Sequence, residues 1–165
     1  MKNMMLALFL VLMVAVLLAG CGKSEELKKV EATLNTEVMQ RHDDLMKSMA
    51  GLDELTAQVD ATMAKHDELV KKYPKQTATH KAGDLMTAKD RLVSAKASME
   101  TWMKGFKPYD AQAKHEEVMA SLTKSKGELT GMQEQFTKAI TTAKEAIASH
   151  TKAADELLAK TAKHK

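Results

Sequence analysis

The sequence contains very little cysteine, proline or aromatic residue, and each shortage excludes a class of protein. Cys21 is the single cysteine, so no internal disulfide bond can stabilise the fold. The only two prolines, Pro74 and Pro108, both fall between periodic segments. Long runs of β-branched residues are absent, while Ala, Lys, Glu, Leu and Met dominate. This composition predicts long helices and an all-α fold.

An excess of one charge and the usual catalytic motifs are also missing. The 25 basic residues nearly balance the 22 acidic ones, so charge does not favour nucleic acid as a partner. No glycine-rich phosphate loop, nucleophile elbow or zincin motif occurs in the sequence. The acidic pairs at 43–44 and 116–117 flank apolar stripes, and we expect them to face water rather than act as catalytic carboxylates. The sequence therefore predicts a protein that is not an enzyme and needs no cofactor.

The longest apolar run lies close to the N-terminus. Residues 4–18 form this run after Lys2, and its 15 residues match the apolar region of a signal peptide. A membrane-spanning helix needs roughly 20 residues. The run leads into Leu18-Ala19-Gly20-Cys21, which resembles the lipobox of bacterial lipoproteins. The resemblance implies cleavage before Cys21, a diacylglycerol on its sulfur and acylation of the new amino group; an uncleaved anchor or a plain buried thiol is the alternative.

Lipidation would make Cys21 a membrane anchor. Each buried methylene contributes about 0.8 kcal/mol, so two or three acyl chains attach a protein almost permanently. In Gram-negative lipoproteins an aspartate after the cysteine commonly retains the protein at the inner membrane, so Gly22 implies the outer membrane. Residues 23–26 also resemble the lysine-plus-acidic signal that sends some Bacteroidota lipoproteins to the cell surface. We expect a lipid-anchored outer-membrane protein that faces the periplasm or the exterior.

Three periodic segments fill the remaining chain, at about 24–73, 79–106 and 110 to near the end. Ser24 is a candidate N-cap for the first segment. Pro74 should end it, because proline lacks an N–H and disfavours helix in the preceding residue. Residues recur every seven positions in all three segments, which is typical of helices packed side by side. The first series is Val38, Leu45, Leu52, Val59, His66 and Tyr73; the second is Leu85, Leu92, Met99 and Phe106; the third is His115, Leu122, Leu129, Phe136, Ala143, His150 and Leu157.

These segments predict an elongated, antiparallel three-helix bundle with coiled-coil-like packing. We expect a cleaved signal peptide at 1–20, a lipidated tether and the start of a stalk at 21–33, the bundle at 34–147, and an Ala/Lys-rich helical extension at 148–165. Residues 24–42 should project toward the membrane, and the chain after about Ile140 should project from the far side or fold back. These two ends carry only a narrow apolar stripe and would have little stability alone. An envelope protein partner or self-association could therefore cover the stripe. A break near Gly51 would shorten the first helix.

Histidine and methionine recur together on the predicted helices. His42 and Met46 are four residues apart, as are His115 and Met119, so each pair shares a helix face. Short turns between the helices would set His115 opposite Trp102 and put both beside Met49, with His42 about two turns below. Thioether and imidazole ligands suit Cu(I) and Ag(I), and an indole adds cation–π attraction. The candidate metal set is His42, Met46, Met49, Trp102, Met103, His115 and Met119.

This set resembles, in ligand types only, the small periplasmic copper and silver chaperones. Core packing is the favoured interpretation, because methionine fills irregular cores and a histidine in an apolar stripe usually hydrogen-bonds an acid or a carbonyl. Zinc is disfavoured because no compact His, Cys and Asp set has the usual ligand spacing. A Cu(I)-binding chaperone is therefore the alternative to a non-enzymatic binding or scaffolding module of the cell envelope.

Three motifs resemble a group of small Bacteroidota lipoproteins often labelled "viral A-type inclusion protein". The motifs are HDDLMKSM at 42–49, METWMKGFKP at 99–108 and KHEEVMASL at 114–122. The group usually has His-Asp-Glu-Val-Met-Pro in the first motif, whereas Asp44 and Leu45 vary it here and Lys47 replaces the proline. The resemblance covers about 34–147. It implies an envelope location and a helical fold but no mechanism.

The anchor can be tested by metabolic labelling with a fatty-acid analogue. We expect label in the wild-type chain and none in Cys21→Ser, because the thiol is the acceptor of the diacylglycerol. A Cys21→Ser protein that still incorporates label would contradict the predicted lipidation and localisation.

Overall fold

The computed structural model describes residues 24–77 and 82–162, and the chain within them forms three helices. They are α2 (Glu25–Lys72), α3 (Gly83–Gly105) and α4 (His115–Ala162). Helices α2 and α4 have 48 residues each, or about 72 Å, and the 23 residues of α3 span about 35 Å. The described residues contain no strand. An all-α fold of three packed helices is therefore confirmed.

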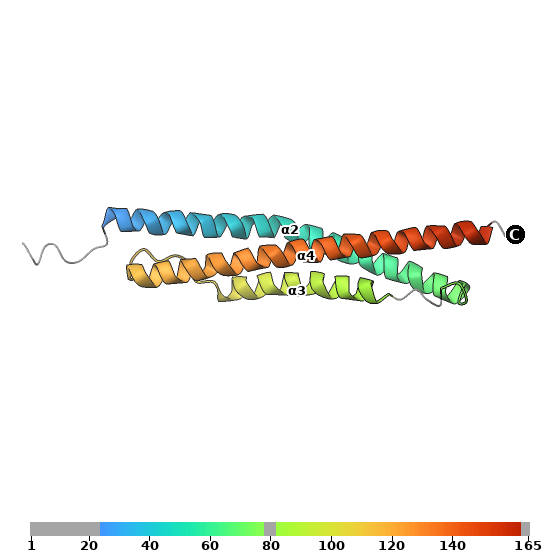
Figure 1. The fold of residues 1–165 in the computed structure, drawn as a ribbon. Coiled ribbons are helices and arrows are strands. Elements are labelled where there is room, and N and C mark those ends of the chain that lie inside the picture. The colour runs from blue at the N-terminus through green and yellow to red at the C-terminus, as the bar shows by residue number, and fades with distance from the viewer. Residues whose placement is uncertain (1–23, 78–81, 163–165) are drawn as a thin grey trace, which may run out of the picture.

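The helices run up, down and up along one rod. Figure 1 shows α2 and α4 pointing the same way along the rod, with α3 lying antiparallel to both against the middle of the molecule. The described part of the chain has no helix with both the length and the apolar character to span a membrane. The predicted signal peptide at 1–20 and the lipobox lie outside the described residues.

The ends of α2 follow the sequence signals. The hydroxyl of Ser24 accepts a hydrogen bond from the Leu27 N–H at 3.3 Å, so Ser24 is the N-cap as predicted. Tyr73 follows the last helical residue, directly before Pro74. The helix is continuous through Gly51, so the alternative break does not occur. Helices α3 and α4 start about four or five residues later than predicted.

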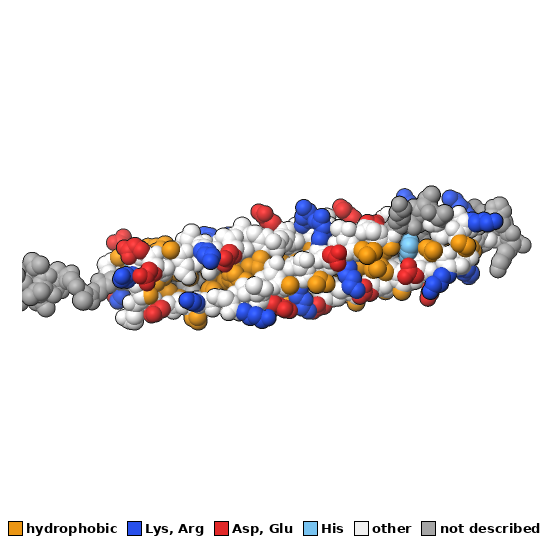
Figure 2. Space-filling view, turned by 90° about the horizontal axis from the view of Figure 1, so that it is seen from below, with side chains coloured by type: hydrophobic (Ala, Val, Ile, Leu, Met, Phe, Trp, Pro, Cys, Tyr) orange, Lys and Arg blue, Asp and Glu red, His pale blue; other side chains and the backbone are white. Residues whose placement is uncertain are grey.

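The core is formed by the seven-residue series of all three helices. Residues such as Val38, Leu45, Leu85 and Ala143 are fully buried, and Phe136 is the largest side chain among them. Charged side chains cover the outside, with acidic and basic groups interspersed along the rod (Figure 2). The fold therefore depends on one narrow apolar stripe per helix.

Helices α2 and α4 are held in a fixed parallel register by contacts across them. Glu31 contacts His115 at one end, and His66 contacts His150 at the other. Both pairs are 84 residues apart, which is a whole number of seven-residue repeats. This register places the buried apolar positions between them in matching layers, as in a parallel coiled coil.

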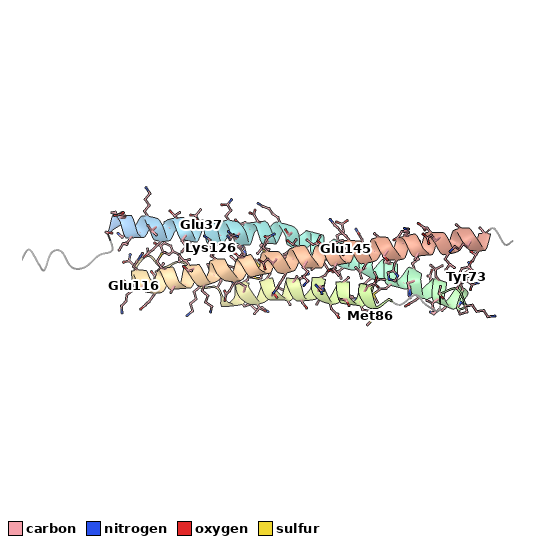
Figure 3. The ribbon with its side chains drawn as sticks, in the orientation of Figure 1. Glu37, Tyr73, Met86, Glu116, Lys126 and Glu145 are labelled. Atoms are coloured by element: carbon pink, nitrogen blue, oxygen red, sulfur yellow. The ribbon has the colours of Figure 1, made fainter. Side chains whose placement is uncertain are left out.

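The two ends of the rod differ from the sequence expectation. The stretch 24–42 does not project as a stalk. Glu31 contacts His115, the first residue of α4, and Glu37 contacts Lys126 further along α4 (Figure 3). The Lys126 hydrogen bond and charge lower the pKa of Glu37 below its ordinary value. The chain after Ile140 also stays on the rod as an unbroken part of α4, where Ala154 and Leu157 are buried.

Three glycines interrupt these helices without a packing reason. A Cβ placed on Gly51, Gly127 or Gly131 would meet no atom within 4 Å. We expect Gly51→Ala to raise the free energy of unfolding by about 0.5–1 kcal/mol, because alanine loses less backbone entropy in a helix. Urea denaturation followed by circular dichroism measures this change. Gly105→Ala, at the last residue of α3, is the matched control and should change stability less. Destabilisation by Gly51→Ala would contradict the continuous α2.

Candidate functional site

A buried carboxylate forms a polar cluster at the end of the rod where α2 begins. Glu31 is completely buried in the first turns of α2. Its Oε1 lies 2.8 Å from Nδ1 of His115, the first residue of α4. Its Oε2 accepts a hydrogen bond from the Tyr109 hydroxyl at 3.0 Å. The cluster thus joins α2, α4 and the connection from α3 to α4.

In this cluster the Glu31 carboxylate accepts hydrogen bonds from groups on either side of it. An ionised carboxylate can only accept hydrogen bonds, so Nδ1 of His115 carries its hydrogen toward Glu31. Burial, and then the hydrogen bond and charge of Glu31, raise the pKa of the Tyr109 hydroxyl. Tyr109 therefore remains a donor at neutral pH. The arrangement suits positioning of the connection between α3 and α4.

The sequence analysis did not find Glu31 or Tyr109. A signal was present, because counting back seven residues from Val38 along the first series gives Glu31. A charged residue in an apolar stripe requires partners from the facing helices. Tyr109 had no comparable signal, since it lies in an irregular connection.

A second cluster places aromatic rings around Trp102 at the C-terminal end of α3. The Trp102 and Phe106 rings stack with centroids 4.6 Å apart, and the His42 ring on α2 lies 5.7 Å from Trp102. Nδ1 of His42 lies 3.0 Å from a carboxylate oxygen of Asp43. Two members of the predicted metal set, His42 and Trp102, are therefore in contact.

The structure separates His115 from Trp102, contrary to the expected level. The chain leaves α3 in an extended conformation at Phe106 and continues to Lys114 before α4 begins. This connection carries α4 beyond the end of α3 (Figure 1), so His115 reaches Glu31 and His42 takes the place beside Trp102. The expectation was wrong because it assumed a tight turn near Pro108.

The methionines of the predicted set do not share one environment. Met46 and Met103 are exposed, whereas Met49 packs against the core and Met119 is half-buried. Within the described residues, no three His, Cys, Asp or Glu side chains lie close enough together to hold a metal ion. The acidic pairs at 43–44 and 116–117 are exposed, as predicted.

A third polar cluster lies near the other end of the rod. The rings of His66 on α2 and His150 on α4 meet edge-on with centroids 5.2 Å apart. Nε2 of His150 lies 2.8 Å from an oxygen of Asp84, in the first turn of α3. Burial raises the pKa of Asp84, but hydrogen bonds from His150 and the Leu85 N–H outweigh it and leave that pKa below its ordinary value. The cluster ties together all three helices.

A shallow groove runs along the outer seam between α3 and α4. Three adjoining hollows form it: the first and second share Ser94 and Gln135, and the second and third share Thr87. Small side chains such as Ala97 and Gly131 line the groove. Small residues allow another backbone to approach closely, so the groove is a candidate protein-binding surface.

Comparisons with profiles of known protein families, with curated proteins and with solved structures find no match to this chain.

Removing the Glu31 carboxylate tests the buried cluster. We expect Glu31→Ala to lower the free energy of unfolding by about 2–4 kcal/mol, because two donors lose their acceptor in a buried place. Thermal or urea denaturation measures the loss. The control is Glu37→Ala, which removes an exposed ion pair of the same helix and should have a much smaller effect. Equal effects of the two substitutions would contradict the special role of Glu31.

Proposed function

We propose that this chain is a non-enzymatic adaptor of the bacterial cell envelope, anchored in the outer membrane by lipid on Cys21. Its α3–α4 groove binds a helix of a partner protein. The anchor is supported by the lipobox resemblance at residues 18–21, and the resemblance to small Bacteroidota lipoproteins supports the envelope location. Helix α2 begins at Glu25, so only a short tether separates the rod from the lipid.

The observation that carries the proposal is the continuity of the groove along α3. It extends from Gly83 to Lys107 on one wall and from Ser121 to Ser149 on the other. The walls combine small residues with Trp102, Phe106 and charged side chains, and a long, shallow seam of this kind fits a rod-shaped ligand better than a compact molecule.

The Cu(I) chaperone is the less favoured function. The predicted Cu(I) site needs His115 beside Trp102, whereas His115 contacts the Glu31 carboxylate instead. His42 and Trp102 alone leave a smaller soft-ligand set, in which Met46 and Met103 face solvent.

Site-specific photo-crosslinking in the native host tests the adaptor proposal. A benzophenone amino acid at Thr101, exposed on the groove wall, should give a discrete adduct with an envelope protein. The matched control is the same probe at Gln40, exposed on α2 away from the groove, which should give none.

Filling the groove supplies the second arm of this experiment. Ser94→Trp should reduce the adduct at Thr101 several-fold while the helical circular dichroism spectrum stays unchanged, because Ser94 is exposed on the groove wall. Equal adducts from the two probe positions, or an adduct that survives Ser94→Trp, would contradict the groove as the binding surface.

A further inference from the structure

His66 and His150 occupy positions that the seven-residue series reserves for apolar side chains. Each is mostly buried, with 12% and 10% of its side chain exposed. Burying polar rings in an apolar layer costs free energy unless they gain partners. Two such rings meeting at one level therefore require a specific explanation.

Each ring is held by a carboxylate on one nitrogen only. Nδ1 of His66 lies 3.4 Å from Asp67, and Nε2 of His150 lies 2.8 Å from Asp84. A carboxylate accepts a hydrogen from the ring nitrogen that it faces, which leaves the lone pair on the other nitrogen. The free lone pairs are therefore on Nε2 of His66 and Nδ1 of His150. Carboxylate on one nitrogen and metal on the other is the usual arrangement of histidine ligands in proteins.

The free nitrogen of His66 has no partner in the described structure. Its Nε2 is the one fully buried side-chain nitrogen or oxygen among the described residues that makes no hydrogen bond. Both histidines line a cavity of about 180 Å³ between α2 and α4, which has room for an ion and several waters. A buried ring nitrogen without a hydrogen bond, in a side chain that lines a cavity, is a candidate ligand position.

The distance between the rings also fits a shared ion. A zinc–nitrogen bond of about 2.0–2.1 Å puts an imidazole centroid about 3.2 Å from the metal. Two such rings at a tetrahedral angle have centroids about 5.2 Å apart. The observed separation of 5.2 Å has this value.

The charges around the cavity permit a cation. Asp67 and Asp84 bring two carboxylates behind the rings. Lys65 also lines the cavity, and its ammonium group is paired with Asp155 at 3.9 Å. Imidazole ligands suit zinc and the neighbouring transition metals rather than calcium or magnesium.

We propose that Nε2 of His66 and Nδ1 of His150 bind one divalent transition-metal ion in the cavity between α2 and α4. Water or a ligand brought from outside completes its coordination, since the described residues provide no third His, Cys, Asp or Glu at this point. The ion would clamp the far halves of α2 and α4 together. The two proposed ligands lie outside the α3–α4 groove, although Asp84 lines one end of it, and neither belongs to the predicted Met/His/Trp set.

The test uses Zn²⁺ as the probe on the full chain, purified in detergent micelles without a polyhistidine tag. Competition with a chromophoric chelator should show one Zn²⁺ per chain. His66→Phe and His150→Phe should each weaken binding at least tenfold, and Asp84→Asn should weaken it about 10–100-fold through the orientation of His150. His42→Phe is the matched control, because it removes a half-buried histidine of α2 outside this cluster and should leave Zn²⁺ affinity unchanged.

A measurement on the wild-type chain keeps the test independent of the folding of the variants. Imidazole ¹⁵N spectra should show that Zn²⁺ shifts the ring nitrogens of His66 and His150, most strongly Nε2 of His66 and Nδ1 of His150, and leaves the rings of the other histidines unchanged. Absence of Zn²⁺ binding, undiminished affinity in both phenylalanine variants, or shifts confined to other histidines would overturn the proposal.

Discussion

The parallel register between α2 and α4 is the constraint on which the rest of the structure depends. Two contacts of equal sequence separation, Glu31 with His115 and His66 with His150, fix the same alignment at opposite ends. Between them, the stripe of buried apolar residues supplies the hydrophobic stabilisation but tolerates sliding by one repeat. A slip of seven residues would leave apolar layers almost unchanged and would bury Glu31 against Leu122. The polar end layers therefore give the bundle one alignment at some cost in stability.

The polar contacts at both ends of the rod also include α3 or the connection that follows it. Tyr109 brings the segment after α3 to Glu31, and Asp84 brings the first turn of α3 to His150. The short helix is thus fixed at its two ends by groups that already hold the long helices. Its outer seam with α4 remains open as the groove, so the elements that fix the fold also define the surface proposed for binding.

The sequence predicted those features that depend on local chemistry. Ser24 and Pro74 marked the start and the end of α2, and the seven-residue series marked the buried face of each helix, because capping, a missing N–H and apolar spacing act within a few residues. The level at which α4 packs against α2 and α3 depends on the conformation of the connection from Phe106 to Lys114. This connection is irregular, so no repeating pattern in the sequence predicts its conformation. Because this connection is longer than expected, His115 contacts Glu31 and not Trp102, the neighbour that the sequence pattern predicted. The contact between the His66 and His150 rings was equally invisible, because these residues are 84 positions apart in the sequence.

The common direction of α2 and α4 has a mechanical consequence. The first residue of α2 and the last of α4 lie at opposite poles of the rod (Figure 1). Tension applied between these poles would load the seam in shear, so every layer would have to yield together instead of opening one after another. A tether at one pole and a bound partner further along would therefore meet a stiff strut rather than a hairpin that can be unzipped.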